Sequence, residues 1–326
     1  AAPGPDQAMS DRVNNRSLRP RSEAFKEFMT TGWDDNEPQI EPLESSKYTP
    51  ARLEALGKAF PGERIVIPAG QPKVRNNDCD YAFRPDTTFS YYTGLGEDFE
   101  AGAVLVLNPV DPDSPEAKAG KTHVPELFVA PRANHYTQDF FMNAHYGEYW
   151  VGPRAGVKEM TAMTGIETND IAQLPDALSK DVGTEAGAVR VRVIRGADPA
   201  ITSMVEEIRE ANGFADPDNN TAADDKLHEF AAEARMCKDE YEVREMRKAV
   251  AATKHGFDNI LRKIPSSLGK PRSERMLEGA FNAISREEGN EVGYDTIIAS
   301  GAHAPILHWM RNTGTVESGE LLLIDA

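Results

Sequence analysis

The sequence predicts an α/β (α+β) protein with two domains, in which a mixed-sheet domain precedes the beginning of a second domain. Its 326 residues, of which 40% are hydrophobic, suffice for about two buried cores. Short apolar runs rich in β-branched residues recur between residues 48 and 194, whereas long segments after residue 226 follow helical spacing. The polar stretch 215–225 separates these two patterns and is expected to be the linker.

The first two parts of the chain are an irregular N-terminal arm, residues 1–47, and a first domain, residues 48–222. The arm has little periodicity, apart from one short helix expected between Ser22 and Thr30. Residues 201–211 repeat apolar side chains at helical spacing, and Asn212-Gly213 is a typical helix stop. The expected strands of this domain are Arg64–Pro68, Phe89–Thr93, Ala103–Leu107, Glu126–Ala130 and Val189–Ile194.

The second domain, residues 223–326, is expected to begin with two helices and continue with two strands. Asp239 can cap the first helix because Glu242 follows at capping-box spacing, and Pro265 is expected to end it. Ser273 is expected to cap the second helix. The expected apolar faces are Val243, Met246, Val250, Phe257 and Leu261, then Met276, Leu277, Ala280, Phe281 and Ile284, and the strands are Asp295–Ser300 and Leu321–Asp325.

Charge and composition exclude several classes of partner. The 36 basic and 53 acidic residues give a net charge of −17, which repels both nucleic acid and anionic membranes. No apolar run reaches the roughly 18 residues of a membrane span. The only cysteines, Cys79 and Cys237, form no redox or zinc motif, and we expect two buried thiols in a cytoplasmic protein.

Two polar residues beside apolar runs are candidates for chemistry. Asp325 follows four apolar residues, and a buried carboxylate without a partner is costly, so it needs a cation or a turn. His308 follows the apolar pair Ile306-Leu307. From these residues alone, a turn cap and a structural histidine fit as well as a metal ligand and an acid–base group.

The second domain carries four short motifs in order: Gly293–Ile297, Ser300-Gly301, Ile306–Trp309 and Gly319–Ala326. This order resembles the pita-bread metallopeptidases and, among them, aminopeptidase P. That family has Gly-Tyr-Asp/Asn-Thr-Ile, then Ser-Gly, then Ile-Leu-His-Tyr, then a strand Gly-Asp-Leu-Val-Leu-Ile-Asp-Ala-Gly.

The resemblance extends over roughly Tyr48 to Ala326. The joint from Arg235 to Lys248 resembles the family's entry to its catalytic domain. The first domain is similar to the family motif Arg-x-x-Asp-x-x-Tyr-x-Phe/Tyr-Arg followed by Phe-x-Tyr-x-Thr-Gly. The matching residues are Arg75, Asp78, Tyr81, Phe83-Arg84, Thr88, Phe89, Tyr91 and Thr93-Gly94.

The resemblance implies two divalent metal ions held by two Asp, one His and two Glu. Asp325 matches the first ligand, and the others are expected beyond Ala326, so we expect the given chain to be truncated in its catalytic domain and inactive alone. Because oxygen ligands dominate this set, Mn²⁺ is the expected metal, with Zn²⁺ or Co²⁺ as alternatives.

The implied activity is removal of the first residue from peptides with proline second. His308 would assist departure of the proline nitrogen or position the substrate. Tyr294, Trp309 and Trp150 would contact the substrate. Two departures affect this pocket, since Trp309 replaces a usual Tyr and His303 replaces a small or polar residue.

Trp150 is the candidate for a contact between subunits. It lies in a stretch that resembles a family edge, Glu-x-Trp-x-Gly, which approaches a neighbour's active site, and a homo-oligomer is therefore expected. The alternative is that Trp150 covers the core of its own domain.

Two other functions remain open at this point. A prolidase shares the fold and metals but accepts only Xaa-Pro dipeptides. Some pita-bread modules bind peptides without catalysis, and loss of the metal ligands marks that branch.

Overall fold

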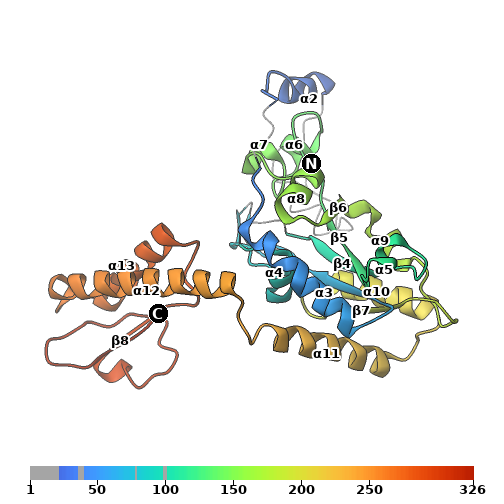
Figure 1. Cartoon of the computed structure of the whole chain (residues 1–326). Helices are drawn as coiled ribbons and strands as arrows, with labels where there is room; N and C mark the ends of the chain where they lie inside the picture. Colours follow the sequence, from blue (N-terminus) through green and yellow to red (C-terminus); the bar gives the residue numbers. More distant parts are fainter. Residues whose placement is uncertain (1–21, 36–39, 78, 98–100) are drawn as a thin grey trace. The chain divides into compact units, whose positions relative to one another are not determined.

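The computed structural model divides the chain into two compact units, Ala1–Cys237 and Lys238–Ala326 (Figure 1). Each unit has its own sheet and its own buried core. The structure describes residues 22–35, 40–77, 79–97 and 101–326, so most of the expected irregular arm and Asp78 lie outside the described residues.

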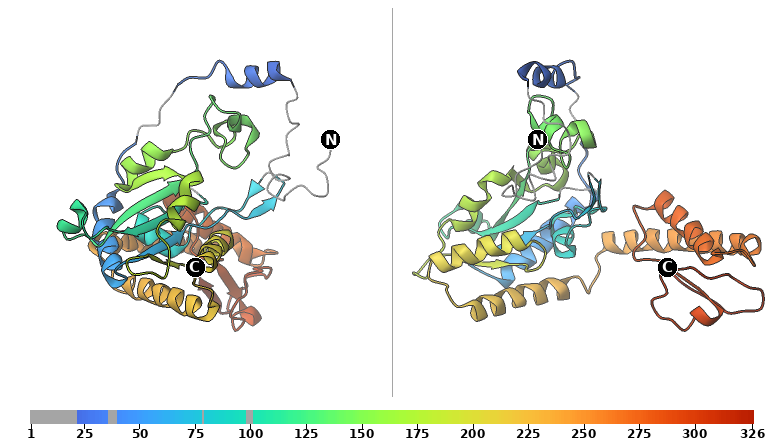
Figure 2. Two further views of the ribbon diagram at one scale, coloured as in Figure 1. Left: turned by 90° about the vertical axis from the view of Figure 1, so that its right-hand side faces the viewer. Right: turned by 180° about the vertical axis from the view of Figure 1, so that it is seen from behind.

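A sheet forms the centre of the first unit (Figure 2). It has five strands in the order β6-β5-β4-β1-β7. β4 is antiparallel to β1 and β5, whereas β6 and β7 run parallel to their neighbours. This combination confirms the predicted mixed sheet. The strands are β1 Glu63–Pro68, β4 Val104–Pro109, β5 His123–Val129, β6 Glu167–Asp170 and β7 Arg190–Val193.

Helices cover both faces of this sheet, because its central strands are apolar on both sides. Along β1, Ile65 and Ile67 belong to one buried cluster and Val66 to the other, as the alternation of a strand requires. The first cluster includes residues of α3, α4 and α11, and the second includes residues of α9 and α10. The helices on these faces are α3 Thr49–Ala59, α4 Thr87–Thr93 and α11 Pro217–Ala234, and α9 Leu174–Ser179 and α10 Pro199–Ala211.

The predicted strand at Phe89–Thr93 is wrong, because this segment is helix α4. Asp86 caps the helix by accepting a hydrogen bond from the Thr88 amide at 2.8 Å, and Gly94 ends it with a φ of 76°. Phe89 and Tyr92 lie three residues apart and both enter the core, which only helical spacing allows. Capping and packing therefore override the aromatic preference for strands.

The predicted linker at 215–225 is also wrong, because α11 begins at Pro217. Its Asp224 is 2% exposed and binds Arg209 at 2.6 Å, and Leu227 joins the first core. A polar helix can pack on the sheet when its buried carboxylate is matched by guanidinium donors. The first unit consequently extends to Cys237, beyond the boundary that we expected at residue 222.

The shorter elements agree with several predictions. Ser22 caps α2 by accepting from the Phe25 amide, and Asn212 ends α10 as expected.

Cys79 and Cys237 are exposed, so the expectation of buried thiols is wrong. The remaining elements of the first unit are α2 Glu23–Thr30, η1 Glu44–Lys47, β2 Val74–Asn76, β3 Cys79–Asp80, α5 Pro115–Lys118, α6 Asp139–Met142, α7 Glu148–Val151, α8 Val157–Thr164 and η2 Ile171–Gln173.

The second unit contains two long helices and a two-stranded antiparallel sheet. Asp239 and Glu242 form the predicted capping box, with both hydrogen bonds at 2.9 Å. Pro265 lies inside the last turn of α12 instead of ending it. The elements are α12 Glu240–Ser267, α13 Ser273–Glu288, β8 Ile297–Ser300, η3 Gly301–His303 and β9 Leu322–Asp325.

The start of α13 differs from the prediction in one respect. Arg272 occupies the cap position with a φ of 56°, and Ser273 makes no capping hydrogen bond. Its hydroxyl instead accepts from the Val316 amide at 2.6 Å. Ser273 therefore fastens the loop that precedes β9.

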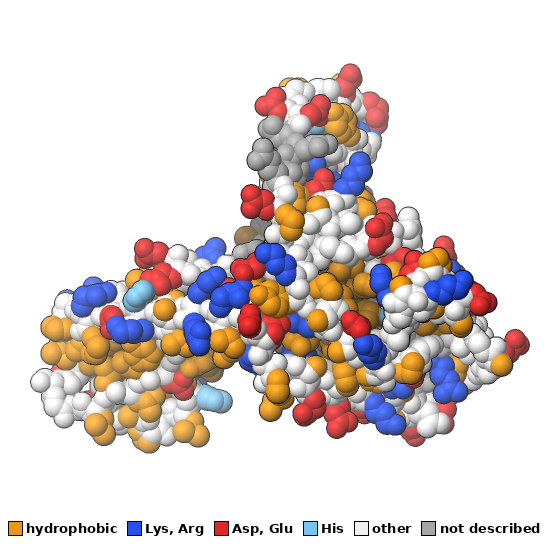
Figure 3. Space-filling model, in the orientation of Figure 1, with side chains coloured by type: hydrophobic (Ala, Val, Ile, Leu, Met, Phe, Trp, Pro, Cys, Tyr) orange, Lys and Arg blue, Asp and Glu red, His pale blue; other side chains and the backbone are white. Residues whose placement is uncertain are grey.

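The core of the second unit uses only part of the predicted apolar face of α12, since Phe257 packs against Phe281. Ile260 is buried, and Gly256 gives room to the Phe281 ring, because a Cβ there would lie 2.6 Å from it. Val250 and Leu261 are 68% and 60% exposed. Apolar side chains accordingly gather on the surface of this unit in Figure 3. Among the described residues, no helix is long and apolar enough to span a membrane.

Candidate functional site

Pairing of β8 with β9 brings two of the predicted site residues together. Ile297 pairs with Asp325, so Tyr294, three residues before Ile297, reaches the end of β9. The Tyr294 hydroxyl donates a hydrogen bond to Asp325 Oδ1, and both side chains are exposed. This hydrogen bond raises the pKa of Tyr294, because the carboxylate favours the protonated phenol.

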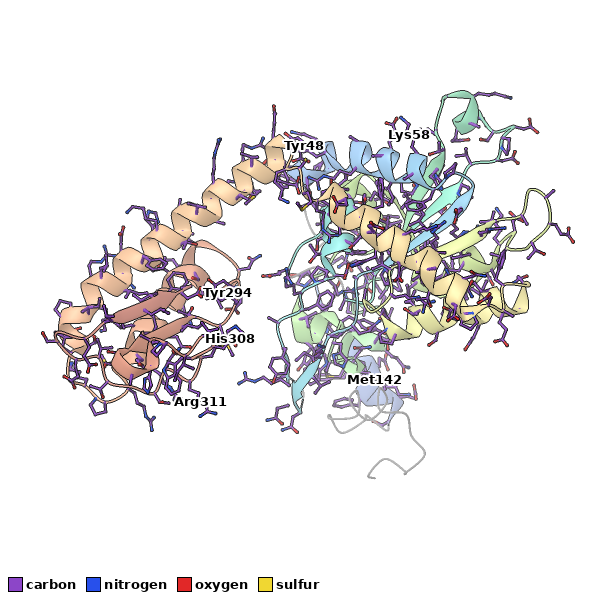
Figure 4. The ribbon with its side chains drawn as sticks, turned by 90° about the horizontal axis from the view of Figure 1, so that it is seen from below. Tyr48, Lys58, Met142, Tyr294, His308 and Arg311 are labelled. Carbon is purple, nitrogen blue, oxygen red and sulfur yellow. The ribbon has the colours of Figure 1, made fainter. Side chains whose placement is uncertain are left out.

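His308 lies on the loop between η3 and β9, and its side chain is exposed. Tyr294 and His308 lie along one edge of the second unit in Figure 4. Within the described residues, the imidazole makes no hydrogen bond, either to Asp325 or to another side chain. It is therefore accessible to a ligand and owes its position to its neighbours in the loop.

Trp309 turns its indole N–H toward the protein interior. Its Nε1 donates to Glu274 Oε2 at 2.8 Å, and its ring stacks on His303 with centroids 3.9 Å apart. The two residues that depart from the family pattern thus contact each other.

Glu274 is the functional candidate that the sequence did not reveal. This carboxylate is fully buried and accepts four hydrogen bonds. Acidic residues are common in the first turn of a helix, because the positive end of the helix dipole stabilises them. The place of Glu274 in the sequence therefore does not distinguish it from an ordinary helix-start residue. The donors are Ser300 N at 2.9 Å, His303 Nδ1 at 2.9 Å, Trp309 Nε1 at 2.8 Å and Gly314 N at 2.6 Å.

The four donors decide the protonation of Glu274. Burial alone would raise its pKa, but the hydrogen bonds outweigh burial and leave the pKa below its ordinary value. An ionised carboxylate only accepts hydrogen bonds, so His303 carries its proton on Nδ1.

Trp150 belongs to the first unit, on α7. Its Nε1 donates to the Phe141 carbonyl at 2.9 Å, and its ring contacts Tyr149 edge-on. It remains 39% exposed, so it both packs on its own unit and presents a surface.

Asp325 is a suitable but incomplete metal ligand. A carboxylate at a strand end suits a hard divalent ion, which needs about six donors. Within the parts that the structure describes, no group of three or more His, Cys, Asp or Glu residues could hold a metal.

Comparison with known families matches both units. Residues 50–189 match the description "Aminopeptidase P, N-terminal domain", and residues 244–326 match "Metallopeptidase family M24". The two matches define a metallopeptidase-type chain with a dedicated N-terminal domain. It belongs to the aminopeptidase P family.

Two curated relatives come from Streptomyces coelicolor. Xaa-Pro aminopeptidase 1 is 38% identical over 94% of this chain and 56% of its own length. Xaa-Pro aminopeptidase 2 is 35% identical over 98% of this chain and 61% of its own length. The chain thus spans little more than half the length of these relatives.

A solved structure supports the fold. Aminopeptidase PepP from Pseudomonas aeruginosa is similar with a TM-score of 0.66 and 24% identity, over 88% of this chain and 59% of that one. The fold, a mixed-sheet domain followed by part of a pita-bread domain, is the one predicted.

The lowered pKa of Glu274 makes the stability of the second unit depend on pH. A carboxyl with a folded pKa below its unfolded value of 4.5 stabilises the fold above that value, and the stabilisation is lost as pH falls through the folded pKa. We expect Glu274→Gln to lower the free energy of unfolding at neutral pH and to flatten its decrease below about pH 5. Urea unfolding at several pH values, followed by hydrogen exchange of the β8 and β9 amides, measures this.

Ser273→Ala is the matched control, because it removes a buried acceptor that does not titrate. It should lower the free energy of unfolding equally at every pH. A parallel shift in Glu274→Gln would contradict the assignment.

Proposed function

We propose that the complete protein is a metal-dependent aminopeptidase that removes the first residue from peptides with proline in second position. The observation that carries the proposal is the meeting of Tyr294 and Asp325 at the end of β9, inside the segment that matches the metallopeptidase family. The names of the two Streptomyces relatives support the same reaction. The proposal concerns the complete protein, because the chain spans 56% and 61% of these relatives.

Asp325 would hold one of two divalent metal ions, and Mn²⁺ is proposed because oxygen donors favour a hard cation. The chemistry that such ions supply is activation of water and stabilisation of negative charge on the attacked carbonyl. Tyr294 supports this role, since its hydrogen bond fixes the orientation of the carboxylate.

His308 is proposed to assist departure of the proline nitrogen. This nitrogen carries no hydrogen in the peptide, so it must be protonated before it leaves. An exposed imidazole without a hydrogen bond to the protein is available to donate that proton, or to orient the substrate. Tyr294, which precedes β8, and Trp309, which follows His308 in the loop, are proposed to contact the substrate.

The peptide substrate and a cytoplasmic location are also part of the proposal. Two exposed thiols, Cys79 and Cys237, suit a reducing compartment. The net charge of −17 favours a peptide with a free, positively charged amino terminus over nucleic acid.

The complete protein should release the first residue from an Xaa-Pro-Xaa tripeptide when Mn²⁺ is added. The 326-residue chain should show no appreciable turnover and weak Mn²⁺ binding, because Asp325 offers at most two of the roughly six donors required. A peptide assay and calorimetric titration on both proteins test this. No release by the complete protein with any divalent metal would refute the proposal, and cleavage of dipeptides alone would make it a prolidase.

His308→Ala in the complete protein should lower turnover by about two to four orders of magnitude, because general acid catalysis contributes that much. Its metal content should not change. Steady-state kinetics and metal analysis are the measurements, and His255→Ala, an exposed histidine paired with Glu288, is the control. Loss of metal would make His308 a ligand, and an unchanged rate would remove it from the mechanism.

We propose further that the protein is a homo-oligomer with Trp150 at the contact between subunits. Trp150→Ala should then shift the sedimentation of the complete protein toward smaller species and reduce peptide turnover, because large aromatic anchors dominate interfaces. Trp150→Phe, which keeps a ring but loses the hydrogen bond to Phe141, controls for local packing. If Trp150→Ala changes neither property, the interface is elsewhere.

A further inference from the structure

The loop between β8 and β9 is tied down by three buried side chains. Ser273 binds the Val316 amide near the end of the loop. Asn312 accepts from Ile298 N at 3.0 Å and donates to the Thr296 carbonyl at 2.8 Å, so it fastens the loop to β8. Glu274 is the third, and it is the one that contacts side chains within the loop.

The two oxygens of Glu274 divide the loop between them. Oε1 accepts from Ser300 N and His303 Nδ1, and Oε2 accepts from Trp309 Nε1 and Gly314 N. One carboxylate therefore joins the end of β8 to both flanks of His308.

Gly314 shows how closely this arrangement is packed. A Cβ at this position would lie 2.6 Å from Glu274 Oε1 and 2.7 Å from His303 Nδ1. The glycine is required there so that the backbone amide can approach the carboxylate. The close packing therefore leaves the loop little freedom to move relative to the Glu274 carboxylate.

His308 depends on this arrangement indirectly. Its imidazole makes no hydrogen bond within the described residues, and its carbonyl accepts only from the nearby Met310 amide. The next residue, Trp309, is fixed by Glu274 and by stacking on His303. Fixing Trp309 fixes the backbone direction from which the His308 side chain projects.

We propose that Glu274 is the positioning residue for His308, acting through Trp309 and His303. The inference rests on the proposed peptidase function, because the position of His308 matters only if it acts on a substrate. Glu274 itself is buried and touches no substrate.

The decisive variant is Glu274→Gln in the complete protein. It keeps the size of the side chain, but its amide nitrogen would face two N–H donors and lose their hydrogen bonds. We expect kcat to fall about 10- to 100-fold, as small misplacements of a reacting group do, with KM within about twofold and metal content unchanged.

Ser273→Ala is the matched control, because it loosens the same loop without touching His303 or Trp309. It should leave kcat within about twofold of the wild type. Trp309→Phe removes the indole donor and part of the ring that stacks on His303. Its effect on kcat and that of Glu274→Gln should add up to less than their sum in the double variant, since both disturb the Glu274–Trp309 hydrogen bond. A kcat near the wild-type value in Glu274→Gln, or an equal loss in Ser273→Ala, would overturn the proposal.

A second measurement on the 326-residue chain separates this inference from the proposed function. The indole N–H resonance of Trp309, one of three tryptophans, should shift in Glu274→Gln and stay in place in Ser273→Ala. An unmoved resonance refutes positioning by Glu274. A shifted resonance in a protein that cleaves no Xaa-Pro peptide refutes the peptidase function while keeping the loop assignment.

Discussion

A buried carboxylate is stable only when enough donors surround it, and each unit of this protein is organised around one that meets this condition. In the first unit, Asp224 is matched by the guanidinium groups of Arg195 and Arg209 and by the Val193 amide, which joins α11 to β7. In the second unit, Glu274 is matched by four N–H groups. Removing Glu274 would leave the Ser300 and Gly314 amides without their acceptor, and removing Asp224 would do the same to the Val193 amide, although Arg195 and Arg209 would still bind Glu206.

The two carboxylates serve different ends. Asp224 holds a helix that composition assigns to a linker, and it thereby enlarges the first unit to Cys237. Glu274 holds a loop whose exposed side chain, His308, carries the proposed proton transfer. This arrangement suits catalysis, because the His308 side chain stays accessible to a substrate while buried hydrogen bonds to Glu274 fix the backbone of its loop. The end of β9, where Tyr294 meets Asp325, provides a second fixed point in the same unit.

One face of α12 is apolar and exposed. Val250 and Leu261 project from a helix whose other face packs on Phe281, and the chain spans 56% and 61% of the two Streptomyces proteins. The sheet of the second unit has two strands, and small sheets need further packing for stability.

The sequence by itself determined the mixed sheet, the capping box at Asp239 and the family, because alternation, cap spacing and ordered motifs are local signals. It also offered Tyr294 and Asp325 as separate candidates, and the structure showed that they meet. Only the tertiary structure decided that Phe89–Thr93 is helical, that α11 packs on the first sheet and that Glu274 supports the His308 loop. The physical reason is that these outcomes depend on which donors and apolar faces meet across distant segments. Glu274 and Trp309 lie 35 residues apart, and no pattern along the chain marks a carboxylate for four donors that folding alone brings together.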